Sequence, residues 1–247
     1  MKWRYRSGVR RVAFGLAVGG ALAVLTAGGM VRYTVSPASG AVVSGGQVGS
    51  SCAVTHQNVE AVDNSTAAAY GNQAMIATNT KGTLNGLRGQ VSRSLFIWAG
   101  TGNDVEVGWA TGGSPMNEPT LYAEWVKDGV DSLQQWAGTI GAGANWHFEV
   151  DNAHGIGIWR FYFDGATKPF SYSPTMPFNS GWALTNSERR NTCDTLWTHF
   201  YSLTDATSLG HYPPWPLLQC WADDAPGWNM QQVSNTEMYV QTSGHVC

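Results

Sequence analysis

The chain has 247 residues, a formal net charge of −3, 13% charged residues and 12% aromatic residues, with twelve tryptophans. So aromatic and weakly charged a composition excludes an intrinsically disordered chain. The charge is unevenly divided: residues 1–32 hold six basic residues and no acid, whereas residues 33–247 hold eight basic and 17 acidic residues. This acidic body lacks the clustered Lys and Arg that phosphate binding needs, which argues against a nucleic-acid partner.

The first segment, residues 1–38, has the pattern of an export signal. A basic stretch, residues 1–11, precedes twenty uncharged residues from Val12 to Val31, and a small-residue cleavage sequence, Ser-Pro-Ala, follows at residues 36–38. Basic residues stay in the cytoplasm while the apolar run enters the bilayer. We expect cleavage and secretion; uncleaved, a run of this length would be a membrane anchor instead. Residues 39–51, rich in Gly and Ser, are predicted to form a flexible linker.

All four cysteines lie beyond the signal, at Cys52, Cys193, Cys220 and Cys247. An even number in an exported protein predicts two disulfides, for which three connectivities exist. We favour Cys193–Cys220, which closes a local loop, and Cys52–Cys247, which joins the two ends of the domain. Free buried thiols are the alternative. No His/Cys spacing indicates zinc, and we expect no metal and no cofactor.

Strand patterns dominate residues 52–247, which we predict to be a single domain. Apolar and polar residues alternate with a period of two at residues 146–151 and 159–164, as in half-buried antiparallel strands. Further strands are predicted at residues 73–78, 93–99, 104–111, 121–127, 132–137, 168–173, 181–186, 195–203 and 236–242.

Helix signals are few in this domain. Residues 57–72 are predicted to hold a short helix, and residues 192–203 have a helical alternative, although their aromatic and Thr content favours the strand at 195–203. Many strands with few short helices predict an all-β fold, a two-sheet antiparallel sandwich of the jelly-roll or concanavalin-like type.

Three motifs in residues 93–125 resemble the core of the neprosin family. They are Ser94-Leu95-Phe96-Ile97-Trp98, then Asp104-Val105-Glu106-Val107-Gly108-Trp109 after a glycine turn, then Tyr122-Ala123-Glu124-Trp125. Actinobacterial secreted proteins of unknown function look similar along most of the body. The relatives of this family are glutamic peptidases on lectin-like sandwiches, in which one glutamate activates water and a partner carboxyl or amide acts on the scissile carbonyl.

The resemblance implies a site on this chain. The first catalytic glutamate falls on Glu106, and Glu188, at the end of a predicted strand, is our candidate partner. Trp98, Trp109 and Tyr122 are expected to bind substrate. The alternatives are structural: Glu106 bonding neighbouring backbone or Arg93, and Glu188 pairing with Arg189 or Arg190 or lying exposed.

A rival constellation is the pair Glu149 and Asp151, which point the same way on one predicted strand. Laminarinase-type glycosidases use a related acidic strand, but Ala153 and His154 stand where their third acid is expected. His147 and Glu149 could also begin a metal site with no nameable third ligand. The simpler interpretation is the solvated face of a hairpin formed by residues 146–164.

Tryptophan supports a second function class. Trp215, Trp221 and Trp228 lie in a proline-rich region and could form an exposed platform for sugar rings, although strand tryptophans are more often core residues. We therefore predict a secreted, acid-acting glutamic endopeptidase of neprosin type. The alternatives are a non-catalytic carbohydrate- or cell-surface-binding module and a structural protein of the cell surface. The expected partner is an extracellular polypeptide or glycan, and the membrane is involved only through an uncleaved N-terminal segment.

Overall fold

The computed structural model describes residues 54–63, 69–78, 91–100, 102–112, 118–152, 155–191, 194–195, 197–208, 210–216, 218–222 and 228–242. The predicted export signal, the linker and the cysteine side chains lie outside this description. Within these ranges there is no helix, and so none that is long and apolar enough to span a membrane.

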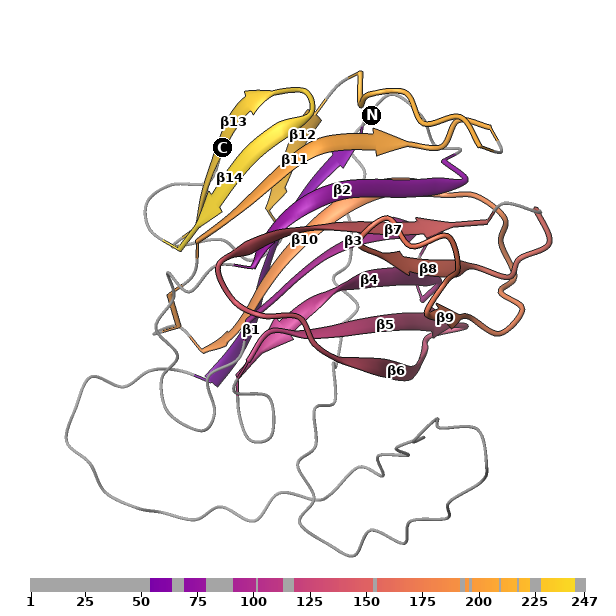
Figure 1. The fold of residues 1–247 in the computed structure, drawn as a ribbon, viewed down its shortest axis with the longest axis horizontal. Coiled ribbons are helices and arrows are strands. Elements are labelled where there is room, and N and C mark those ends of the chain that lie inside the picture. Colours follow the sequence, from indigo (N-terminus) through magenta and orange to yellow (C-terminus); the bar gives the residue numbers. More distant parts are fainter. Residues whose placement is uncertain are drawn as a thin grey trace, which may run out of the picture. The chain divides into compact units, whose positions relative to one another are not determined.

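The fold is an all-β sandwich of two antiparallel seven-stranded sheets, as predicted from the sequence (Figure 1). In spatial order, the first sheet consists of β12 (Leu218–Ala222), β1 (Val54–Asp63), β10 (Trp182–Asn191), β3 (Val91–Trp98), β4 (Asp104–Thr111), β5 (Thr120–Lys127) and β6 (Val130–Thr139). The second consists of β13 (Asn229–Ser234), β14 (Glu237–Gln241), β11 (Trp197–Asp205), β2 (Gly71–Thr78), β7 (Ala144–Asp151), β8 (Arg160–Phe163) and β9 (Ser171–Tyr172).

Each predicted strand overlaps an observed one, and the choice of a strand over a helix at residues 195–203 is confirmed by β11. The helix predicted within residues 57–72 does not occur at residues 57–63, because β1 occupies residues 54–63 and pairs with β10 on one side and β12 on the other. Residues 71–72 belong to β2, and residues 64–68 lie outside the described residues. Three strands, β1, β12 and β13, were not predicted.

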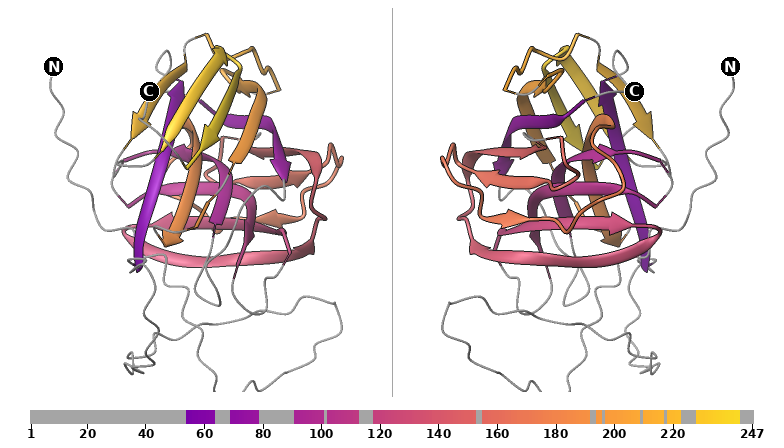
Figure 2. Two further views of the ribbon diagram at one scale, coloured as in Figure 1. Left: turned by 90° about the vertical axis from the view of Figure 1, so that its left-hand side faces the viewer. Right: turned by 90° about the vertical axis from the view of Figure 1, so that its right-hand side faces the viewer.

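The core lies between the two sheets and is built from alternate residues of each strand. On β4, Val105, Val107 and Trp109 belong to it, so the residues between them face away from the core. From the second sheet, Phe148 and Phe161 pack into the same core. β2 and β7 lie over β3, and the side views show the two layers (Figure 2).

One buried amide links the two sheets through polar contacts. Asn72 on β2 is fully buried, and its Nδ2 donates to the carbonyl oxygens of Leu184 at 2.7 Å and Phe96 at 3.3 Å. Those two residues are cross-strand partners on β10 and β3. A buried amide that finds backbone acceptors in the other layer adds a directional contact to the packing of the sheets.

Gly157 is required by a close approach before β8, and replacing it by Ala is expected to destabilise the fold. Its φ is +74°, and a Cβ there would lie 2.5 Å from the carbonyl oxygen of Met176. The left-handed conformation alone costs a non-glycine residue about 1–2 kcal/mol. We expect Gly157→Ala to lower the unfolding free energy, measured in urea, by more than about 2 kcal/mol.

Gly165 provides the matched control, because its φ is +66° and a Cβ at this position would have no neighbour within 4 Å. Gly165→Ala carries the conformational cost without the contact, about 1 kcal/mol. Equal losses in the two variants would show that the approach to Met176 is unimportant.

Candidate active site

The face of the first sheet that points away from the core carries a group of buried polar residues. Cross-strand pairing places them in two adjacent rows that run from β10 through β3 and β4 to β5. The first row is Leu184, Phe96, Glu106 and Glu124; the second is Asn186, Ser94, Gly108 and Tyr122. Glu188 follows Asn186 on the same face of β10, because side chains two apart on a strand point the same way.

These side chains are withdrawn from solvent. Glu106, Glu124 and Glu188 are 6%, 7% and 8% exposed, and Asn186 and Tyr122 are 1% and 3% exposed. A buried carboxyl is costly unless it has hydrogen-bond or charge partners. Such groups are typical of sites that perform acid–base chemistry.

Tyr122 connects the three carboxyls. Its hydroxyl donates a hydrogen bond to Glu106 Oε1. Burial raises the pKa of the Tyr122 phenol well above its ordinary value of 10.0, and the charges of Glu106, Glu188 and Glu124 raise it further. The register of the strands places Tyr122 and the three carboxyls on one face of the first sheet. The phenol stays protonated and remains a donor.

Glu188 is held by its neighbour on the same face: Asn186 Nδ2 donates to Glu188 Oε1 at 2.7 Å. The alternative of a simply exposed Glu188 is wrong, since this side chain is buried. Arg189 projects to the other face, where its guanidinium lies 5.3 Å from the centre of the Trp228 ring in the core. The side chains of Arg93 and Arg190 lie outside the described residues.

Glu124 is the residue that sequence reasoning missed. It is directly opposite Glu106 in the β4–β5 pair, so the two carboxyls are nearest neighbours on one face. The sequence does indicate its position. Glu124 follows Tyr122 by two residues, and the period-two alternation of a strand places both side chains on the same face. The β4–β5 pairing thus brings two acidic side chains together on the face that carries Tyr122.

The three residues expected to bind substrate are placed differently. Tyr122 contacts Glu106 directly. Trp98 is half-buried at the end of β3, with its ring centre 6.0 Å from that of Trp182 in an edge-to-face arrangement. Trp109 is 1% exposed and belongs to the core on the opposite face of β4, so the structure does not bring it together with Glu106.

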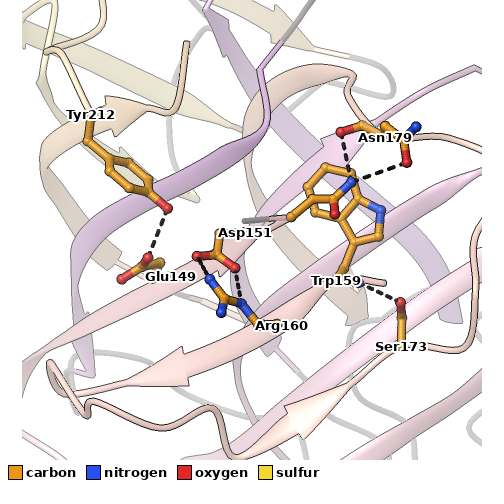
Figure 3. A network of polar contacts seen from close by, with 8 residues as sticks. Glu149, Asp151, Trp159, Arg160, Ser173, Asn179 and Tyr212 are labelled. Carbon is orange, nitrogen blue, oxygen red and sulfur yellow. Dashed lines mark hydrogen bonds and ion pairs between the residues drawn. The ribbon is translucent and has the colours of Figure 1, made fainter. Parts of the chain in front are cut away.

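The acidic pair on β7, Glu149 and Asp151, is hydrogen-bonded to other side chains of the protein (Figure 3). β7 and β8 pair as the expected hairpin. Arg160 binds Asp151 through two hydrogen bonds, of 2.6 and 2.7 Å, and Tyr212 donates to Glu149 at 2.9 Å. Asp151 is only 7% exposed, so this face is less solvated than predicted. Both carboxyls are thus engaged by partners within the protein.

His147, the other candidate on this face, has its Nε2 3.2 Å from Gln73 Oε1. Burial lowers the pKa of His147 below its ordinary value of 6.5. No group of three metal-ligating side chains occurs in the part of the chain that the structure describes.

The exposed tryptophan platform is wrong for two of its three members. Trp215 and Trp228 are 1% and 0% exposed and lie in the core. The side chain of Trp221 lies outside the described residues. The large apolar side chains that are exposed among the described residues are Val130, Ile156, Tyr172 and Val233, and none of them is a tryptophan.

Replacing Glu149 by Gln is expected to flatten the pH dependence of stability. Burial raises the pKa of Glu149 above its ordinary value of 4.5, an effect that the Tyr212 hydrogen bond partly opposes. An acid whose pKa rises on folding contributes stability at pH values below 4.5 and loses it as the pH rises through the raised value. Gln keeps an acceptor for Tyr212 but carries no charge.

The free energy of unfolding of Glu149→Gln should therefore exceed that of wild type by up to about 1 kcal/mol at neutral pH and should equal it in acid, measured by urea unfolding at each pH. The exposed Glu118 supplies the control, and Glu118→Gln should follow wild type throughout. A variant at Glu149 with the wild-type pH profile would contradict this interpretation.

Comparison with known proteins gives the class of this fold. No family model matches the chain, and no curated protein matches it. Among solved structures, scytalido-glutamic peptidase with a transition state analog inhibitor aligns with a TM-score of 0.55 and 10% identity, covering 77% of this chain and 98% of that chain. Its complex with a peptide-based transition state analog gives 0.54 and 11%, with the same coverage.

SCP-B, a member of the eqolisin family of peptidases in a complex with the tripeptide Ala-Ile-His, aligns with a TM-score of 0.50 and 10% identity over 77% of this chain and 98% of that chain. The protein is thus a two-sheet β-sandwich. More specifically, it has a glutamic-peptidase-like fold over nearly the whole length of these structures. At such low identity the likeness concerns the fold alone.

Proposed function

We propose that the protein is a secreted, neprosin-like endopeptidase that acts in acid and uses Glu106 and Glu188. One observation carries this proposal: two buried glutamates from separate strands, β4 and β10, lie on the face of the first sheet that also carries Tyr122, in a fold shared with glutamic peptidases. The composition agrees, because residues 33–247 hold only eight basic residues. Little positive charge then accumulates in acid to drive unfolding.

The two glutamates take different roles. Glu188, whose Oε1 accepts from Asn186, is the base. Glu106, opposite Glu124 and hydrogen-bonded by Tyr122, carries the proton of the carboxyl pair and donates it to the scissile carbonyl oxygen. This division follows the rule that neighbouring acids in unlike environments separate into one acid and one base.

The reaction balances without a cofactor. Water attacks the carbonyl carbon while Glu188 takes one of its protons, and the Glu106 proton passes to the carbonyl oxygen, giving a neutral gem-diol. The C–N bond then breaks as Glu188 returns its proton to the departing amine. One diol hydroxyl becomes the new carbonyl and returns its proton to Glu106. Both side chains end as they began, and one water is consumed per bond.

A substrate must be able to reach the buried carboxyls. Because the three carboxyls are at most 8% exposed, a polypeptide can reach them only when this face opens. The assay should therefore include preincubation in acid, which protonates carboxylates and weakens the contacts that depend on them.

The test uses the full chain, expressed with its own N-terminal segment and recovered after export. It is incubated with denatured protein from about pH 2 to about pH 7, and new peptide ends are identified by mass spectrometry. We expect internal cleavage that is strongest in acid. Absence of cleavage over this range, after acid preincubation, would overturn the proposal. The carbohydrate-binding alternative has lost the exposure of Trp215 and Trp228 on which it depended.

A further inference from the structure

Two polar atoms without partners lie side by side in the second row of the candidate site. Ser94 is fully buried and Asn186 is 1% exposed, and the two residues are directly paired across β3 and β10. Ser94 Oγ and Asn186 Oδ1 have no hydrogen-bond partner among the described residues. The orientation of the Asn186 amide is fixed, because its Nδ2 donates to Glu188.

Leaving a buried polar atom without a partner is unfavourable, so two neighbouring ones indicate that something else binds there. Buried waters bind where at least two polar groups converge. Gly108, the next residue in the row after Ser94, contributes no side chain between Ser94 and Tyr122. In this row the serine hydroxyl thus has polar side chains on both sides, Asn186 on β10 and, beyond Gly108, Tyr122 on β5.

We propose that Ser94 Oγ and Asn186 Oδ1 together hold the water that attacks the peptide bond. The inference rests on the proposed function and names residues that the glutamate pair alone does not supply. The water donates one proton to Asn186 Oδ1 and the other to the Glu188 carboxylate. It accepts the Ser94 hydroxyl proton on one lone pair. The remaining lone pair is free to attack the carbonyl carbon.

This arrangement uses three of the four hydrogen-bonding positions of the water and leaves the fourth, a lone pair, directed at the carbonyl carbon. Ser94 is accordingly a water-positioning residue, and no covalent bond forms to it. Loss of the Ser94 hydrogen bond leaves the base and the acid in place, but the water is no longer held in one position. A misplacement of the water by about 1 Å costs roughly 100-fold in rate.

Ser187 provides a matched control on the neighbouring strand. Its Oγ is also buried and without a partner among the described residues, but it faces the core side of β10. Removing either hydroxyl deletes one buried oxygen. Only the hydroxyl of Ser94 lies on the face that carries Glu106 and Glu188.

The first test compares Ser94→Ala with Ser187→Ala in the full chain, using a peptide that wild type cleaves. We expect Ser94→Ala to lower kcat by about 10- to 100-fold with little change in KM, and Ser187→Ala to retain wild-type kcat. Equal losses in the two variants, or wild-type kcat in Ser94→Ala, would overturn the inference.

The second test does not depend on activity. A high-resolution crystal structure of wild type should show an ordered water within about 3.2 Å of both Ser94 Oγ and Asn186 Oδ1, and Ser94→Ala should lose it. A dry site in wild type would overturn the inference. If the water is present but wild type cleaves nothing, the proposed function is wrong while the water site stands.

Discussion

Glu188→Gln is expected to lower kcat by about 10²- to 10⁴-fold, the contribution typical of a general base. Gln has nearly the shape of Glu and keeps an acceptor for Asn186 Nδ2, but it cannot take a proton from water. Folding should therefore be retained while the chemical step is lost. The measurement is steady-state cleavage of a defined peptide, with urea unfolding to confirm that the variant is folded.

Glu106 offers an internal comparison, because its proposed role needs a hydrogen-bond donor and not a base. In Glu106→Gln the amide oxygen still accepts from Tyr122 and the amide nitrogen still donates to the carbonyl, so we expect a loss on the order of 10-fold. Glu106→Ala removes both contacts and should lose about 10²- to 10³-fold. If Glu106→Gln were inactive and Glu188→Gln remained active, Glu106 would be the base and Glu188 the acid.

Glu149→Gln is the distant control for both glutamates, since Glu149 lies on the second sheet. It should alter stability at neutral pH and leave kcat unchanged. If replacing Glu106 and Glu188 has no more effect on cleavage than replacing Glu149, the assignment of the site is wrong.

The largest expected effect on stability comes from Trp159→Ala, about 3–5 kcal/mol. Trp159 is completely buried, its ring centre lies 5.3 Å from that of Phe178, and its Nε1 donates to the Phe178 carbonyl at 3.4 Å. Its backbone nitrogen also donates to Ser173 Oγ at 3.0 Å. Truncation leaves a cavity where the segment before β8 joins the core.

Urea unfolding of Trp159→Ala should be compared with that of Tyr172→Ala on the neighbouring β9. Tyr172 is 56% exposed, and its loss should change the unfolding free energy by less than about 0.5 kcal/mol. A loss below about 1 kcal/mol in Trp159→Ala would mean that the surrounding residues close over the cavity.

Local patterns predicted most of this fold because alternation is a property of one strand. Residues 146–151 and 159–164 show it clearly, and they form β7 and β8. β1 escaped prediction because its core positions include the small residue Ala61, and its structure depends on pairing with β10 and β12, which lie more than a hundred residues away in the chain.

The candidate site was predictable only in part, for the same reason. Glu106 followed from a motif, and alternation along the strand already places Glu124 on the face of Tyr122. The pairing of Glu124 with Glu106 depends on the β4–β5 register, which the alternation does not give. Trp109 is different: it lies three residues from Glu106, so the alternation of a strand already places it on the opposite face. The sequence alone does not relate Ser94 to the site. The order of β10, β3 and β4 places its strand between the strands that carry the two glutamates.

The Asn72 contacts have a mechanical consequence. Apolar packing is non-directional and by itself tolerates sliding of one layer over the other. The bonds from Asn72 to the Phe96 and Leu184 carbonyls resist it, because a slip of β2 by one residue would turn this amide away from the core and break both. Phe96 and Leu184 stand in the same row as Glu106, so this amide sets the alignment of the two layers at the strands that carry the proposed chemistry.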